Sequence, residues 1–192
     1  MPKPGRTSAA GNTLSIAGCG LEVRFNWTGD RYAHSVWDVR GPEVCLLSSL
    51  EGKLDQSWPP SPPLQQFHIE HRPTGDVALL VGMAGSAHWS ASFGAGAPDG
   101  ALLVQAACRS KAVMGALGSS YRAIGAAKIL LDQTACAIEM TACKCLLDPG
   151  LATRLLALED CAWGVRFAPE LIECVNPHTV QWSYGISLNV DR

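Results

Sequence analysis

The chain has 192 residues, of which 47% are hydrophobic and 17% charged, and its formal net charge is −2. This length and apolar content support a folded domain with a substantial core and exclude a disordered chain. The slight negative charge argues against a nucleic-acid-binding protein, which needs a basic surface to displace counterions. No apolar run reaches the ~20 residues of a membrane span, and no block of like charge suits an anionic bilayer, so we expect no membrane partner.

The N-terminal residues 1–11 are rich in Pro, Gly, Ser and basic residues and predict a flexible tail. The following segment, Ile16 to Cys19, resembles a lipoprotein cleavage box, but the residues before it are too polar for a signal-peptide core. We therefore expect a cytoplasmic protein, with an exported lipoprotein anchored through Cys19 as the alternative. The eight cysteines include no CxxC pair, which fits reduced thiols in the cytoplasm.

The first clear strand signal is LEVRFNW, residues 21–27, in which apolar and polar residues alternate. Thr28-Gly29-Asp30 supplies turn chemistry, and RYAHSVWDV, residues 31–39, can return as the second arm of a hairpin. That pairing would place Trp27 near Tyr32 at the tip.

Short apolar runs separated by Gly, Pro and Asp follow, and this spacing predicts an antiparallel meander. The runs are 44–50, 65–71, 77–84, 88–93 and 101–107. The C-terminal run from Val180 to Val190 alternates most cleanly and predicts a last strand.

The region 110–150 is harder to interpret because its Ala and Gly content obscures the period. LGSSYR, residues 117–122, favours a turn over an anion site at Arg122. Asp148-Pro149 and the leucines after it fit one short helix near 148–158, while the alternation in 161–167 favours a strand there instead. The predicted fold is mainly β: one domain over 12–192, built as an antiparallel β-sandwich or barrel.

Candidate functional residues concentrate between Ser57 and Ser90, which holds three of the five histidines. On a strand, His68 and Glu70 share one face and His71 takes the other; His88 can share the face of His68. A zinc site at His68 and His88 would be strained, because a strand lies between them and no third ligand is evident. Cys143 and Cys145, on one side of a strand, could suit a soft metal, but two small buried hydrophobes are the simpler interpretation. We expect no metal and no cofactor.

The run Trp58-Pro59-Pro60-Ser61-Pro62-Pro63 is a polyproline-type segment. Its PxxP spacing could serve a proline-binding groove, but a rigid connection across the end of a sheet, with Trp58 packed beneath, is the favoured interpretation. The candidate binding surface comprises Trp58, His68, Glu70, His88, Trp89 and Ser90, with Trp27 and Tyr32 as further candidates.

Several segments resemble an uncharacterised family of bacterial β-rich proteins of similar length: WPPSPPLQ, GMAGSAHWS with the later ACR, LGSSYRA and HTVQWSYGISL. The resemblance extends from about Leu21 onward and implies a bacterial source. It implies no activity, ligand or catalytic residue.

These residues support three functional hypotheses. The first is a non-catalytic domain that binds a small molecule, a carbohydrate or a protein through aromatic and polar side chains. The second is an enzyme in which His68 and Glu70, with His88, perform acid-base or metal-assisted chemistry. The third is a structural or assembly subunit that buries its tryptophans against a partner chain, which makes an oligomer possible.

Overall fold

The architecture is taken from a computed structural model of the chain. The structure describes residues 12–16, 20–96, 100–112, 114–131, 136–140, 143–170 and 178–189. The expected N-terminal tail, the lipoprotein residue Cys19 and the end of the last strand at Val190 lie outside the described residues.

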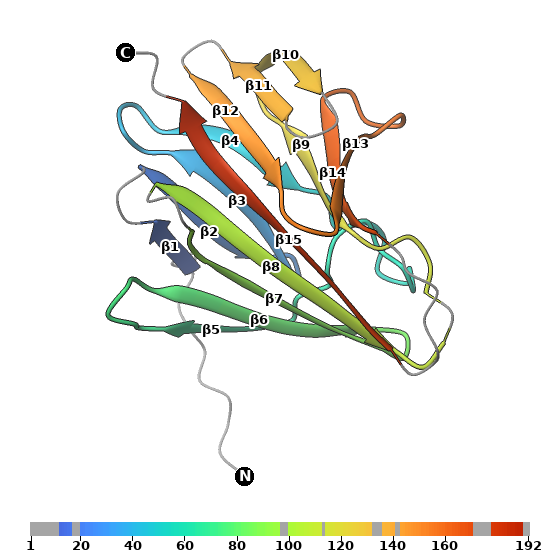
Figure 1. The fold of residues 1–192 in the computed structure, drawn as a ribbon. Coiled ribbons are helices and arrows are strands. Elements are labelled where there is room, and N and C mark those ends of the chain that lie inside the picture. Colours follow the sequence, from blue (N-terminus) through green and yellow to red (C-terminus); the bar gives the residue numbers. More distant parts are fainter. Residues whose placement is uncertain are drawn as a thin grey trace.

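The described chain forms fifteen strands in two antiparallel sheets that pack face to face as a sandwich (Figure 1). The seven-stranded sheet has the order β1-β2-β3-β4-β9-β14-β13, and the eight-stranded sheet has the order β10-β11-β12-β15-β8-β7-β6-β5. The strands are β1 (Asn12–Ile16), β2 (Leu21–Trp27), β3 (Tyr32–Asp38), β4 (Val44–Ser49), β5 (Gln66–Glu70), β6 (Val77–Ala84), β7 (Ala87–Ala95), β8 (Ala101–Ser110), β9 (Ser119–Ala123), β10 (Ala126–Leu131), β11 (Cys136–Met140), β12 (Lys144–Pro149), β13 (Thr153–Ala157), β14 (Gly164–Pro169) and β15 (His178–Asn189). The sandwich prediction is confirmed, and the barrel alternative is wrong because the sheets do not close.

The hairpins expected from turn residues are present. β2 pairs with β3 through the turn at residues 28–31, and Trp27 lies opposite Tyr32 with ring centroids 5.1 Å apart. β5 to β8 form a meander as expected, in which Gly85 (φ +56°) occupies the tight turn between β6 and β7. The run 44–50, expected in the same meander, instead forms β4 of the seven-stranded sheet, between β3 and β9. β15 then pairs with β8 and becomes an interior strand of the eight-stranded sheet.

Two local expectations are corrected. The short helix near 148–158 is wrong: this segment forms the end of β12, a turn and β13. Thr153 is buried and Arg154 exposed, which is the period of a strand, and pairing with β14 satisfies the backbone groups that a helix would have paired internally. The turn expected at 117–122 is also wrong, because Ser119 begins β9, whose inward residues include the buried Tyr121.

The core lies between the inward faces of both sheets and is mainly aliphatic and aromatic. Three cysteines belong to it: Cys108, Cys136 and Cys145 are buried. Burial raises the pKa of the Cys136 thiol to about 11, so it remains protonated and packs as a small apolar group. Cys143, one residue before β12, is half-buried.

The proline-rich segment crosses from β4 of one sheet to β5 of the other, as the rigid-connection interpretation predicted. The Ser61 hydroxyl donates to the Ser120 carbonyl and accepts from the Ser120 amide. The Leu64 carbonyl accepts from the Tyr32 amide at 2.7 Å, and the Gln65 amide donates to the Val81 carbonyl at 2.8 Å. The crossing therefore hydrogen-bonds to strands of both sheets.

Gly82 makes this crossing possible. It occupies an inward-facing position of β6, where a Cβ atom would stand 1.8 Å from the carbonyl oxygen of Pro63. Such an overlap with main-chain atoms requires the crossing or the strand to move. Only glycine fits the observed contact.

We expect Gly82→Ala to lower the free energy of unfolding by about 1–3 kcal/mol, the usual cost of overpacking. Gly41→Ala is the matched control, because a Cβ atom at Gly41 meets nothing within 4 Å and its backbone needs no positive φ. Urea denaturation of both variants measures the difference. Equal stability of the two variants would contradict the tight approach of Pro63.

Candidate functional site

The outer face of the eight-stranded sheet carries a regular array of small polar and aliphatic side chains. The strand register places Leu79, Ser92, Gln105 and Ser183 in one row across β6, β7, β8 and β15. The next row contains Val81, Ser90, Ala107 and Gln181, and a third row contains Met83, His88, Arg109 and Thr179. Successive rows are two residues apart along each strand, so all of these side chains point outward.

Three connected depressions lie over these rows, and we call them together the outer trough. The first has a volume of about 630 Å³ and covers the first two rows. The second, of about 440 Å³, shares Val81, Ser90 and Ala107 with the first. The third, of about 630 Å³, shares Met83, His88 and Arg109 with the second. The trough therefore runs along the strands from the Gln105 row to the Arg109 row, a span of ~13 Å.

A turn with an exposed apolar side chain borders one side of the trough. Leu151, in the turn between β12 and β13, is 95% exposed and contributes to the wall of the first depression. Its neighbour Ala152 has φ +57°, a conformation that costs a non-glycine residue about 1–2 kcal/mol. The Gly150 amide donates to the Ser183 carbonyl at 2.9 Å and fixes this turn to β15. This turn at the border of the trough therefore combines a strained backbone at Ala152 with an exposed apolar side chain at Leu151.

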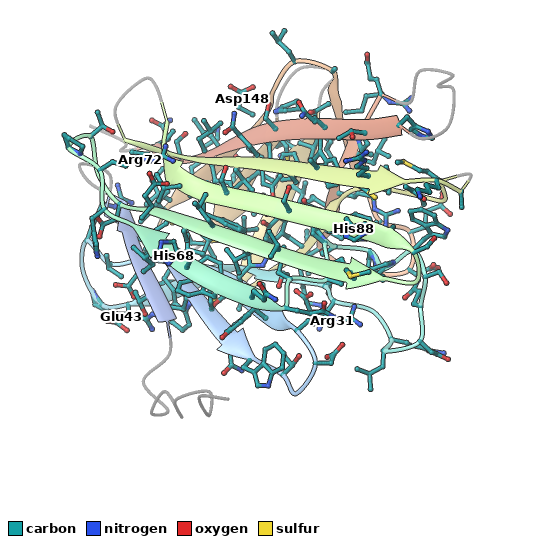
Figure 2. All side chains as sticks on the ribbon, turned by 90° about the horizontal axis from the view of Figure 1, so that it is seen from below. Arg31, Glu43, His68, Arg72, His88 and Asp148 are labelled. Carbon is teal, nitrogen blue, oxygen red and sulfur yellow. The ribbon has the colours of Figure 1, made fainter. Side chains whose placement is uncertain are left out.

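His68, Glu70 and His88 occupy the outer face, but they do not converge. His68 pairs with Leu79, and Leu79 with Ser92, so His88 lies two strands away and four residues further along β7. That offset corresponds to ~16 Å between Cα atoms. Figure 2 shows the two histidines well apart along the strands. The three residues form no common acid-base site.

Glu70 and His71, at the β5 edge of the eight-stranded sheet, each pair with a nearby charged residue. The Arg72 guanidinium donates to the Glu70 carboxylate at 2.7 Å and holds the pKa of that carboxyl below its usual range. His71 follows β5, is exposed and contacts Asp76 at 2.8 Å. Both are exposed surface pairs, which contribute little to stability.

The remaining candidate residues divide between the surface and the core. Ser90 is exposed in the middle of the trough. Trp89, expected on the surface, is buried: its ring packs edge-on against Trp182 and lies 6.2 Å from that of Trp58, which is half-buried beneath the crossing. Strand alternation accounts for this, because adjacent residues of β7 face opposite sides.

Trp27 and Tyr32 lie on the other sheet, at the tip of the β2–β3 hairpin. Tyr32 packs against Phe67 of β5 with ring centroids 5.7 Å apart, so this aromatic pair closes the edge of the sandwich. Trp27 remains 48% exposed.

Metal ligands do not gather among the described residues. No group of three or more His, Cys, Asp or Glu side chains converges there in a way that could hold a metal ion.

Sequence reasoning missed a polar chain through the core. The Trp182 indole nitrogen donates to the Ser119 hydroxyl at 3.0 Å. The hydroxyl groups of Tyr184 and Tyr121 lie 2.7 Å apart, and the Tyr121 hydroxyl lies 2.7 Å from Nε2 of His34. The chain joins β15 of one sheet to β9 and β3 of the other. His34 and the apolar Val36 are two residues apart on β3, so strand alternation could have placed both side chains on the inward face.

Protonation along this chain follows from burial. Burial lowers the pKa of His34 to about 3 and raises that of Tyr121 well above its ordinary value. The tyrosine therefore keeps its proton and shares a hydrogen bond with Nε2 of a neutral imidazole, whose buried Nδ1 has no partner among the described residues. Because the His34, Tyr121 and Tyr184 side chains are all buried, we assign this chain to the core and not to a reaction site.

Glu51 is a second titratable group whose pKa is shifted by burial. Its carboxylate accepts a hydrogen bond from the Ser49 hydroxyl, which in turn accepts from the His34 amide. Burial raises the pKa of Glu51 to about 7, against the lowering effects of Ser49 and the nearby Arg31. Although the residue is partly exposed, its Oε2 atom is buried without a partner.

Comparisons with known proteins found no matching family model, no matching curated protein and no matching solved structure. The described part of the chain contains no helix with the length and hydropathy of a transmembrane span. Functional inference for this protein therefore depends on the geometry of the outer trough.

The two buried groups predict opposite pH dependences of stability. The unfolded chain binds a proton at His34 below pH 6.5 and the folded protein only near pH 3, so the stability from His34 is complete above pH 6.5 and is lost as pH falls toward 3. The folded protein protonates Glu51 up to about pH 7 and the unfolded chain only near pH 4.5, so the stability from Glu51 is complete below pH 4.5 and is lost as pH rises to 7.

We expect these contributions to cancel in the wild-type protein between pH 4.5 and 6.5. In Glu51→Gln the free energy of unfolding should rise with pH over that window, by up to ~1.4 kcal/mol per unit. In His34→Gln it should fall with pH. Urea denaturation at several pH values measures the slopes, with the exposed Glu159→Gln as control. A Glu51→Gln slope equal to that of the wild type would contradict the burial of this carboxyl.

Proposed function

We propose that the protein is a non-catalytic binding domain that holds an oligosaccharide in the outer trough. The observation that carries this proposal is the lining of the trough, in which hydroxyl and amide side chains alternate with small aliphatic ones on a rigid sheet. The polar members are Ser90, Ser92, Gln105, Gln181 and Ser183.

The chemistry of this lining suits a ligand with many hydroxyl groups. Serine hydroxyls and glutamine amides each donate and accept, as sugar hydroxyls do. Among those five side chains, the only described side-chain hydrogen bond joins Ser92 to Gln105, at a long 3.4 Å. Their remaining capacity is free for a ligand, and Leu79 and Val81 offer apolar surface to the carbon faces of a sugar.

The position of the trough also supports binding. Interior strands of a sheet hold their side chains more precisely than loops do. The enzyme hypothesis has no comparable support, since it needs His68 and His88 to act on one substrate and these residues are ~16 Å apart.

A second candidate function, self-assembly through this face, is favoured by exposed apolar side chains at the trough. Val81 and Met83 are each 46% exposed, beside the more exposed Leu151. Light scattering after size exclusion tests it: a dimer that dissociates in Val81→Asp supports assembly, and a monomer over the working concentration range excludes it.

We expect wild-type protein to bind members of a panel of neutral and acidic oligosaccharides, and Ser90→Trp to lose at least tenfold in affinity because the indole fills the trough. The matched control is Asn26→Trp, which adds the same side chain at an exposed position of the other sheet. Glycan-array binding followed by calorimetry measures the effect. Absence of binding to the whole panel, or equal binding by both variants, would overturn the proposal.

A further inference from the structure

The outer trough is electrically asymmetric. Its first depression is lined by neutral residues only. The third depression, at the other end, is lined by His88, Arg109 and Lys111 together with Met83, Ser86 and Ser110. No acidic residue lines any of the three depressions in the described part of the chain. A chain of net charge −2 therefore concentrates positive charge at one end of the outer trough.

Arg109 and Lys111 at this end lack the carboxylate partners that four of the other arginines have. Arg24, Arg31, Arg40 and Arg72 each form an ion pair with a carboxylate at 2.6–2.8 Å. Among the described residues, no carboxylate pairs with Arg109 or Lys111. These two cations face the trough.

The register brings the basic groups together. Arg109 lies directly opposite His88 on the neighbouring strand, and such cross-strand side chains start ~5 Å apart. Lys111 follows β8 by one residue. A planar guanidinium beside an imidazole presents several donors to one point, which is the arrangement that carboxylate and sulfate groups accept best. A bound anion would also offset the repulsion between the cations.

We propose that the oligosaccharide is acidic and binds in one direction, with a carboxylate or sulfate group at His88, Arg109 and Lys111 and its sugar rings over Ser90, Gln105 and Gln181. This inference rests on the proposed function and specifies the class of ligand. A single ligand that contacts both ends of the trough must span the ~13 Å between the Gln105 and Arg109 rows.

An acidic peptide is the competing occupant, and the sheet disfavours it. Extended peptides bind sheets by adding a strand to a free edge. Most of the trough lies over β6, β7, β8 and β15, each of which is paired on both sides, and only Gln66 of the lining belongs to the edge strand β5. The four interior strands offer no free backbone edge, so affinity over them must come from side chains.

The test compares acidic oligosaccharides with neutral forms of the same chains. The probes are hexamers of galacturonate and guluronate with their methyl esters, and chondroitin sulfate with its desulfated methyl ester. Calorimetry should show at least one acidic probe binding tenfold or more tightly than its neutral form. Arg109→Gln should lower the affinity for the acidic probe and so remove that preference. Arg122→Gln, an exposed arginine on the other sheet, is the control and should behave as the wild type.

The outcomes separate the two proposals. Equal binding of acidic and neutral forms, with no effect of Arg109→Gln, would overturn the acidic ligand and keep oligosaccharide binding. Binding of hexaglutamate in preference to every sugar would replace the glycan by a peptide. Absence of binding to all sugars would overturn both proposals. Thermal melting of Arg109→Gln confirms that the variant is folded.

Discussion

The contact between the Pro63 carbonyl and the bare backbone of Gly82 determines how the two sheets join. The chain leaves the seven-stranded sheet after β4 and enters the other sheet at β5, and this crossing lies directly against β6 at that contact. The Gln65 side chain, just after it, bonds the backbone of Met83 and forms one wall of the trough. A displacement of the crossing would therefore move β5 and the trough wall together.

The hydrogen-bonded polar side chains in the core fix the relative position of the two sheets, whose interface is otherwise apolar. Apolar packing alone allows two sheets to slide at little cost, whereas a hydrogen bond between Tyr121 and Tyr184 fixes one position. Burial of a neutral His34 with one unpartnered nitrogen costs stability, and the stacked rings of Tyr184 and Phe167, 3.9 Å apart, help to offset it. The interior thus favours a defined arrangement over maximal stability.

Strand periodicity and turn residues predicted much of the fold, including the hairpin at 28–31 and the meander of β5 to β8, and the proline-rich composition of 58–63 predicted the rigid crossing. It failed where small or mixed residues obscured the period, as at Ser119–Ala123, and where the spacing of leucines suggested a helix. The candidate site was predicted only in part: Ser90 and His88 line the trough, but Gln105, Gln181 and Arg109 were missed. Register between strands distant in sequence brings those residues together, and β15 pairs with β8 across a separation that no local pattern reveals.

The outer trough differs from the arginines Arg24 and Arg166 of the other sheet in what its side chains have left to offer a ligand. On the seven-stranded sheet, Arg24 pairs with Glu22 and Glu43 and lies 4.2 Å from the Trp37 ring, and Arg166 donates to Ser120. Those groups are already satisfied, so a ligand would have to break existing bonds to gain new ones. On the eight-stranded sheet, Arg109 and the serine and glutamine side chains of the trough stand on rigid interior strands with most of their capacity unused. A ligand there would break few existing bonds, and the shared lining residues make the neutral trough and its basic end one continuous surface.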